Sequence, residues 1–199
     1  MLRTYERTRD FTDVQRLIAI AVFTVLTILA AKIQINTVPV PFTMQPLVVI
    51  LAGMVLGGRD GALAMFGYVS LIALGLPFDA NGLGTAALFG PTGGYLIGFI
   101  AAAGVVGMIV ENLPDHFVSR FVAGVIGVAV IYLFGVVVLK NIQSIALEET
   151  VSWSTAWAWG AKPFVGLDLV KVVIAAGLTE SARRLLIQQW QNATKSKNQ

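Results

Sequence analysis

The sequence predicts an all-α membrane protein, with six transmembrane helices in a single domain over residues 1–199. Hydrophobic residues make up 56% of the chain, the mean hydropathy is +0.78, and only 13% of the residues are charged. A soluble domain carries about 25% charged residues, so this composition indicates a chain that lies in a lipid bilayer. Apolar runs recur along its length, separated by breaks that contain Pro, Gly or charge. The runs are Leu17–Ala31, Pro46–Gly57, Ala62–Leu76, Gly94–Val110, Phe121–Leu139 and Val165–Ala182.

Each run is the core of one expected helix. A full span takes about 20 residues, and several runs are shorter, so we expect some helices to be tilted or broken. Two runs contain GxxxG spacing, Gly53–Gly57 and Gly94–Gly98, which is typical of close contact between membrane helices. Polar residues follow the last run and predict a flexible tail over about residues 190–199.

The basic residues predict the orientation of the spans. With six spans, both termini lie on one side of the membrane, and that side holds ten of the 14 Lys and Arg residues. Cytoplasmic segments carry the excess of Lys and Arg, so the termini are expected in the cytoplasm. The net charge of +3 then reflects topology, and no nucleic-acid partner is expected. With no cysteine and one histidine, the chain offers no disulfide, thiolate catalyst or multi-histidine metal site.

Three connections face the other side of the membrane. They are Lys32–Gln45, Pro77–Gly93 and Asn141–Gly166. The first has three prolines in NTVPVPFTMQP and predicts a stiff, extended lid, to which Gln45 brings a donor and an acceptor. The second combines glycines such as Gly90 with Asn81, Thr92 and Tyr95. Glycine lets the backbone approach a ligand closely, so this loop is a candidate binding segment.

The third connection carries three tryptophans, Trp153, Trp157 and Trp159. Tryptophan is enriched where membrane and water meet, so these residues are interpreted as interfacial anchors. The alternative interpretation is that they cover a ligand.

Asp168 and Lys171 are two formal charges inside the last apolar run, VGLDLVKVVIAAGL. Residues three apart share one face of a helix, and charges at membrane depth are costly and are usually functional. Two interpretations compete. The pair locks the last helix against a neighbour, or it is the polar anchor of a pocket, with a carboxylate that accepts from ligand N–H groups and an ammonium that donates to ligand oxygens.

Four segments together resemble the BioY family, the biotin-specific S components (substrate-binding subunits) of energy-coupling-factor (ECF) transporters. The segments are VPVPFTMQ (Val38–Gln45), GLP (Gly75–Pro77), LFGPTGGYLIGF (Leu88–Phe99) and Asp168-x-x-Lys171. The resemblance covers essentially the whole chain. It implies a compact six-helix bundle in the cell membrane that binds biotin. It also implies partners, namely a transmembrane coupling subunit and two cytoplasmic ATPase subunits.

The resemblance also implies site residues. In the family, an Asp and a Lys of the last helix, together with a polar residue in the loop before GP[ST]GGY, contact the bicyclic ring of biotin. Asp168, Lys171 and Asn81 match these positions. Gln45, Tyr95 and the loop around Gly90 and Thr92 are the remaining candidates for contacts with biotin, including its carboxylate. No other cofactor is expected.

Departures from the family pattern concern two sites. S components commonly show Ala-x-x-x-Ala on the first helix, where they meet the coupling subunit, whereas this chain has Ala21-x-x-x-Val25. Asp79, beside Asn81, adds a carboxylate that the family loop lacks, and we expect it to be a solvated loop charge.

Other functions are less well supported. An S component for another vitamin keeps the architecture and changes the ligand, and a stand-alone biotin facilitator keeps the ligand and omits the ATPases. The sequence contains no GxxxxGK[ST], so any ATP hydrolysis would reside in separate subunits. An intramembrane protease would need a Ser–His pair, two membrane aspartates or HExxH, and the chain offers none of these. The protein is therefore not expected to be an enzyme.

Overall fold

The computed structural model describes residues 12–197, and for residues 183 and 186–197 it describes the backbone alone. Helices dominate this part of the chain, which confirms the predicted all-α class, and two short strands form an antiparallel hairpin. The elements in chain order are α2 (Asp13–Lys32), β1 (Gln34–Ile35), β2 (Phe42–Thr43), α3 (Gln45–Ala73), the 3₁₀ helix η1 (Gly84–Phe89), α4 (Gly93–Asn112), α5 (Phe117–Ala146), α6 (Trp153–Gly160) and α7 (Val165–Lys197).

Local sequence signals begin several of these helices. Thr12 caps α2, since its side chain accepts from the backbone N–H of Gln15 and the Gln15 side chain accepts from the backbone N–H of Thr12. Ser152 caps α6 in the same way through the N–H of Thr155. In α7, Asp168 lies in the first turn, where a carboxylate interacts favourably with the positive end of the helix dipole.

Four helices are long and apolar enough to cross a membrane, namely α2, α3, α4 and α5. Helix α7 is longer still and carries Asp168, Lys171 and Glu180. The number of spans and the side on which the termini lie remain predictions. Helix α7 continues through Lys197, so the backbone of the polar segment expected as a tail is helical to that residue. The flexibility of this segment also remains a prediction, and residues 198 and 199 lie outside the described residues.

Helix α3 consists of two segments that meet at Gly57. Gly57 has φ 85° and ψ 179°, a conformation that glycine adopts without strain. A methyl group placed on Gly61 would lie 3.0 Å from the Cα of Gly53, whereas residues eight apart in a straight helix are separated by about 12 Å. The chain therefore folds back sharply here, between the second and third apolar runs.

The GxxxG glycines lie in close contact with a neighbouring helix at all four positions. Methyl groups on Gly53 and Gly94 would lie 2.5 Å from the carbonyl oxygen of Ala103 and 2.3 Å from that of Phe134. Gly98 also faces α5 closely, with Ile131 at 3.2 Å from such a group. The packing interpretation is confirmed for these three glycines. It holds for Gly57 as well, because a methyl group on Gly107 of α4 would lie 2.3 Å from the carbonyl carbon of Gly57. Gly57 in addition makes the turn in α3.

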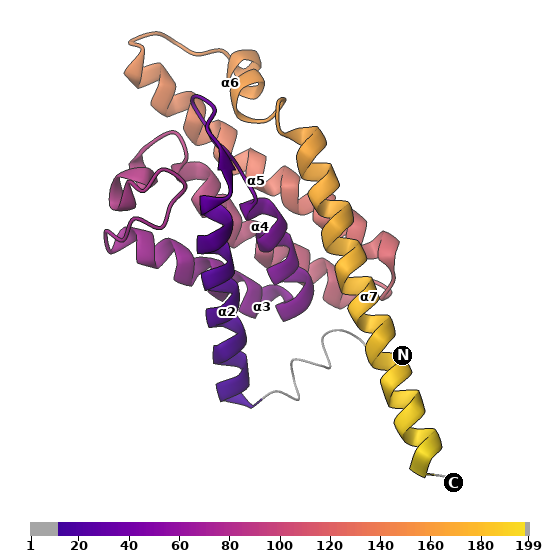
Figure 1. Cartoon of the computed structure of the whole chain (residues 1–199). Helices are drawn as coiled ribbons and strands as arrows, with labels where there is room; N and C mark the ends of the chain where they lie inside the picture. The colour runs from indigo at the N-terminus through magenta and orange to yellow at the C-terminus, as the bar shows by residue number, and fades with distance from the viewer. Residues whose placement is uncertain (1–11, 198–199) are drawn as a thin grey trace.

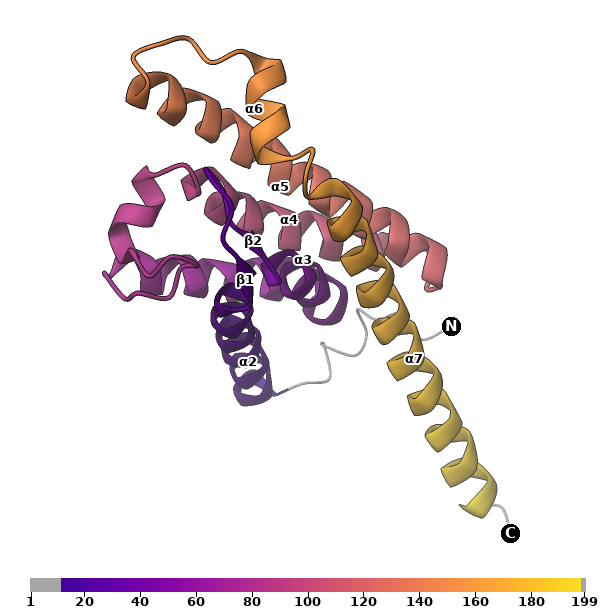
Figure 2. The same ribbon diagram turned by 45° about the horizontal axis from the view of Figure 1, so that its top comes forward.

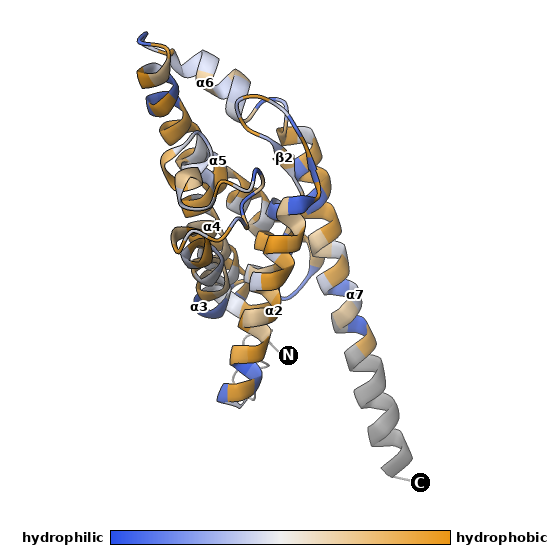
Figure 3. Ribbon diagram, turned by 60° about the vertical axis from the view of Figure 1, so that its left-hand side comes forward, coloured by the Kyte–Doolittle hydropathy of each residue, from blue (hydrophilic) through white to orange (hydrophobic). Residues whose placement is uncertain are grey.

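The helices form a bundle in which α4 lies between α3 and α5, and α7 runs across α3 and α5 (Figure 2). Helix α2 packs chiefly against α3. The hairpin and α6 lie at one end of the bundle, whereas the first turn of α2 and the last turn of α7 point the other way (Figure 1). We call the end with the hairpin and α6 the hairpin end, and the opposite end the far end. Helices α2 and α5 are hydrophobic over most of their length (Figure 3), and many of their large hydrophobic side chains are exposed, as expected for helices that face lipid.

Buried charges join α5 to α7 toward the far end. Arg120 of α5 is 2% exposed, and its Nη1 donates to Glu180 Oε2 of α7 at 2.6 Å. The same guanidinium donates to Asp115, which precedes α5. Arg184 Nε donates to the second oxygen of Glu180 at 2.9 Å. These four residues are called the far cluster below.

Candidate functional site

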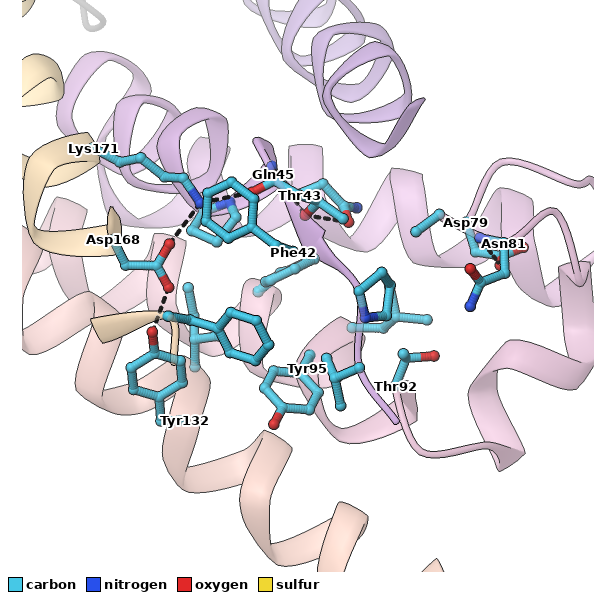
Figure 4. Close-up of a pocket in the computed structure, with 18 residues that line it drawn as sticks. Phe42, Thr43, Gln45, Asp79, Asn81, Thr92, Tyr95, Tyr132, Asp168 and Lys171 are labelled. Atoms are coloured by element: carbon cyan, nitrogen blue, oxygen red, sulfur yellow. Dashed lines mark hydrogen bonds and ion pairs between the residues drawn. The ribbon is translucent and has the colours of Figure 1, made fainter. Parts of the chain in front are cut away.

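A pocket lies at the hairpin end of the bundle, between the hairpin, the loop from α3 to α4, and the helices α4, α5 and α7 (Figure 4). Its walls are largely apolar and aromatic, and its polar groups come from segments far apart in the sequence. The apolar lining is Val40, Pro41, Phe42, Pro46, Ala80, Leu96, Phe99, Ile131 and Phe164, and the polar lining is Thr43, Gln45, Asp79, Asn81, Thr92, Tyr95, Tyr132, Asp168 and Lys171. This composition is typical of sites that bind a small molecule.

Asp168 and Lys171 lie on one face of α7, as their spacing predicts. Each is 3% exposed, and Lys171 Nζ donates to Asp168 Oδ1 at 2.6 Å. The second carboxylate oxygen, Oδ2, accepts from the hydroxyl of Tyr132 on α5. Together Asp168, Lys171 and Tyr132 are called the pocket cluster below. The pair joins α7 to α5 and to the hairpin, which confirms its contact with neighbouring elements. It also lines the pocket, and its role as a ligand anchor remains a prediction.

Lys171 connects the pocket cluster to the hairpin. Its Nζ donates to the backbone carbonyl of Thr43 at 2.6 Å and lies 3.8 Å from the ring centroid of Phe42. The carboxylate, the carbonyl oxygen and the aromatic face all stabilise the buried ammonium. The hairpin register places these contacts, since Gln34 pairs with Thr43 and Ile35 with Phe42.

Gln45 begins α3, and its amide is already engaged within the protein. Its Nε2 donates to the hydroxyl of Tyr68 at 2.7 Å, and its Oε1 accepts from the hydroxyl of Thr43 at 3.1 Å. The Tyr68 hydroxyl in turn donates to the carbonyl of Phe78 at 3.3 Å. Gln45 therefore ties the hairpin to the loop after α3, and it lines the pocket with its amide held in place. Its contact with a ligand remains a prediction.

Tyr95 lines the pocket with its ring, while its hydroxyl points to α6. The hydroxyl donates to the carbonyl oxygen of Gly160 at 2.8 Å. The ring lies against α5, where a methyl group on Gly135 would lie 2.3 Å from it. Tyr95 thus provides an aromatic wall and holds the end of α6 in position.

Asn81 and Thr92 line the pocket on the side opposite Asp168, and Asp79 lies beside Asn81 (Figure 4). Asn81 is exposed, and the Thr92 hydroxyl donates weakly to the carbonyl of Ala87, at 3.4 Å. Within the described residues, Gly90 is not part of the lining. The structure thus brings Asp168 and Lys171 together and places Asn81 apart from them.

The prediction that Asp79 is a solvated loop charge is wrong. Asp79 is 3% exposed, and its carboxylate accepts from the backbone N–H groups of Asn81 at 3.0 Å and Gly84 at 2.8 Å. An aspartate in such a turn satisfies the N–H groups of its own loop. Asp79 therefore shapes the loop that presents Asn81.

Two side chains, one at the end of α2 and one in β1, hold this loop in position. Lys32 Nζ donates to the carbonyl oxygens of Pro77 at 2.9 Å and Asp79 at 2.7 Å. Gln34 Nε2 donates to the carbonyl of Ala80 at 2.9 Å. The end of α2 and the first strand of the hairpin therefore set the position of the loop that carries Asn81.

Sequence reasoning missed Tyr132 and Phe42 as site residues. A tyrosine inside an apolar run is the only signal that Tyr132 carried, and its partner lies 36 residues away. Of the three tryptophans, none is among the described residues that line the pocket. Trp157 instead packs edge-on against Tyr132, with ring centroids 6.2 Å apart. The interfacial role of the tryptophans remains a prediction.

Comparison with known proteins places this geometry in context. Residues 4–188 match the family model described as the BioY family. The biotin transporter BioY of Thermotoga maritima is 40% identical over 176 residues, which cover 88% of this chain and 99% of that protein. The biotin transporter BioY of Rhizobium etli is 37% identical over 157 residues, covering 74% and 80%. The crystal structure of the S-component for biotin from an ECF-type ABC transporter has the same fold, with a TM-score of 0.76 over 87% of this chain and 95% of that one, at 22% identity.

Proposed function

The chain belongs to the BioY family, and we propose that it binds biotin in this pocket and mediates biotin uptake as the S component of an ECF-type transporter. Family membership and the four apolar helices make it a multi-pass protein of the cell membrane. The two relatives described above are transporters, and on this proposal the protein is a transport subunit that binds its ligand without changing it.

The chemistry of biotin supports the pocket as its site. The ureido group has two N–H donors and one carbonyl acceptor, so it is matched by a carboxylate together with an ammonium or amide. The fused rings and the aliphatic tail are apolar and fit aromatic and aliphatic walls. Asp168 would accept from the ureido N–H groups. Lys171 would donate to the ureido oxygen, and Asn81 would donate from the opposite side.

The observation that carries this proposal is the burial of Asp168 and Lys171 on the wall of an otherwise apolar pocket. Two charges in such a place cost desolvation free energy. A ligand that complements both of them gives a reason for keeping them there.

Titration of biotin into the detergent-purified protein by isothermal calorimetry tests the ligand and the site together. We expect saturable binding of biotin, and no binding of thiamine or riboflavin. Asp168→Asn and Lys171→Ala should each weaken biotin binding at least about tenfold, or about 1.4 kcal/mol. Glu149→Gln and Lys162→Ala make the same chemical changes at exposed residues outside the pocket lining and should leave the affinity unchanged.

Absence of biotin binding by a folded, monodisperse sample would overturn the proposal. Tight binding of thiamine or riboflavin in place of biotin would favour the alternative of another vitamin. Equal losses in the pocket variants and in the two exposed variants would remove the site assignment while keeping the ligand.

The exposed face of α2 is the proposed contact for the transmembrane coupling subunit. This face is apolar and exposed. It presents the side chains of Ile18, Ala21, Val22, Val25 and Leu26. Val25 is exposed on this face. It stands where the family pattern has its second alanine, so only one of the two small residues of that pattern, Ala21, is present. Ala21 keeps the backbone of α2 accessible to a close neighbour.

Substitution on this face tests the partner. Ala21→Trp should abolish co-purification with the coupling subunit and the two ATPase subunits while biotin binding persists. Leu133→Trp, on the exposed surface of α5, is the matched control and should retain the complex. Biotin uptake in cells that lack these subunits would support the stand-alone facilitator instead.

A further inference from the structure

We propose that Tyr132 is a positioning residue of the biotin site, which fixes the Asp168 carboxylate in the orientation that receives the ligand. This inference rests on the proposed function and assigns a role to a residue that the sequence motifs do not mark. Tyr132 lies on α5, and the carboxylate it contacts lies on α7.

The carboxylate of Asp168 is held at both oxygens by different helices. Lys171, one turn along α7, donates to Oδ1 at 2.6 Å, and the hydroxyl of Tyr132 donates to Oδ2 (Figure 4). A carboxylate offers about four lone-pair sites. Two donors therefore hold its plane and leave lone pairs for ligand N–H groups. Without the hydroxyl, the side chain is tethered at one oxygen and is free to rotate about its terminal bond.

Packing within the protein keeps Tyr132 in place without a ligand. The residue is 6% exposed, and its ring meets the ring of Trp157 edge-on at an angle of 79°. This edge-to-face contact is a favoured arrangement of aromatic rings. The hydroxyl therefore presents a fixed donor, and the carboxylate is pre-organised before binding.

A purely structural clamp between α5 and α7 is the competing explanation for this hydrogen bond. The two roles differ in one respect. If Tyr132 acts through Asp168, loss of its hydroxyl weakens biotin binding only while the carboxylate is present. Loss of a clamp lowers the stability of the protein without ligand and leaves the biotin affinity of the folded protein unchanged. A double-mutant cycle separates these outcomes.

The experiment measures biotin affinity of the detergent-purified full chain for the wild type, Tyr132→Phe, Asp168→Ala and the double variant. Because Tyr132 acts on biotin only through Asp168, we expect a roughly three- to tenfold weaker affinity for Tyr132→Phe, a smaller loss than a direct hydrogen bond to a charged group would give. In the Asp168→Ala background the same change should cost less than about twofold. Thr179→Val is the control, because it removes a partly buried hydroxyl of α7 that is bonded at 2.9 Å to Ala175 O, outside the pocket lining. It should change the affinity less than about twofold in both backgrounds.

Wild-type affinity for Tyr132→Phe would overturn the inference, as would equal losses in the two backgrounds. If Asp168→Ala binds no biotin at millimolar concentration, the comparison of Tyr132→Phe with Thr179→Val decides alone, and a threefold difference is required. The apparent melting temperature without ligand is recorded for each variant, and a loss of affinity that follows only a loss of folded protein also overturns it. A wild type that does not bind biotin contradicts the proposed function itself.

Discussion

Helices α5 and α7 are joined by buried charges at two places, and the two places differ in what surrounds them. In the pocket cluster, Asp168 and Lys171 lie on the wall of a cavity and contact the hairpin as well as α5. In the far cluster, Arg120 and Glu180 contact each other at 2.6 Å, and neither is among the described residues that line the pocket. Burial of an ion pair is common to both. A cavity beside the pair distinguishes the candidate binding site.

The difference has a physical basis. An ion pair that is enclosed by protein stabilises the fold only if its hydrogen bonds offset the desolvation of both charges. An ion pair beside a cavity keeps unused donors and acceptors that a ligand can reach. We therefore expect substitutions in the far cluster to change stability, and substitutions in the pocket cluster to change ligand binding.

The largest effect is expected from Arg120→Leu. This change removes a guanidinium that is 2% exposed and donates to both Glu180 and Asp115. Breaking a buried ion pair at one partner costs about 3–5 kcal/mol of folding free energy. The apparent melting temperature should fall strongly, while the folded protein that remains binds biotin within twofold of the wild type. Lost biotin affinity at an unchanged melting temperature would contradict the proposed division between the clusters.

The double variant Asp168→Leu, Lys171→Met tests the pocket cluster from the opposite direction. Replacement of a buried ion pair by apolar residues of similar volume is often neutral for stability or stabilising by about 1–4 kcal/mol. We therefore expect a melting temperature near or above that of the wild type. Biotin affinity should fall by at least about tenfold, or about 1.4 kcal/mol, in calorimetric titration. If the variant fails to fold, the pair has the same structural role as the far cluster.

A smaller effect is expected from Asn81→Ala. Asn81 is exposed and lies across the pocket from Asp168 (Figure 4). Loss of one hydrogen bond to a neutral ligand group costs about 0.5–1.5 kcal/mol, so biotin affinity should fall by about two- to tenfold. The melting temperature should not change. Unaltered affinity would exclude Asn81 from the site and leave all polar recognition to the pocket cluster.

The smallest effect is expected from Arg184→Ala, which removes the exposed member of the far cluster. The Arg184 side chain is 71% exposed, although its Nε lies 2.9 Å from Glu180 Oε1. Exposed pairs one helical turn apart contribute about 0.3–0.5 kcal/mol, which corresponds to a shift of about 1–2 °C in a chain of this size. Thermal unfolding beside Arg120→Leu gives the comparison. A loss as large as that of Arg120→Leu would mean that exposure does not govern the contribution of these charges.

Local features of the sequence were enough to predict the class of the protein and two of the three residues of the pocket cluster. Apolar runs predicted the helices, because hydropathy over about 20 residues suffices to identify a membrane span. The spacing of Asp168 and Lys171 predicted their shared face, because helical periodicity requires no partner. The break between the second and third runs was also visible in the segment GGRDG. The spacing of Gly53 and Gly57 indicated packing, but it did not indicate that Gly57 also makes the turn.

The remaining features depend on which elements face each other. Tyr132 reaches Asp168 across 36 residues, and the Tyr95 hydroxyl reaches Gly160 across 65, so one tyrosine supports the carboxylate while the other holds α6. Asp79 is buried because its loop folds onto its own carboxylate. The sequence alone therefore determined a membrane bundle of the BioY type with a charged pair on its last helix. Only the tertiary structure decided which groups surround that pair, because local periodicity sets the face of a side chain and long-range packing selects its partner.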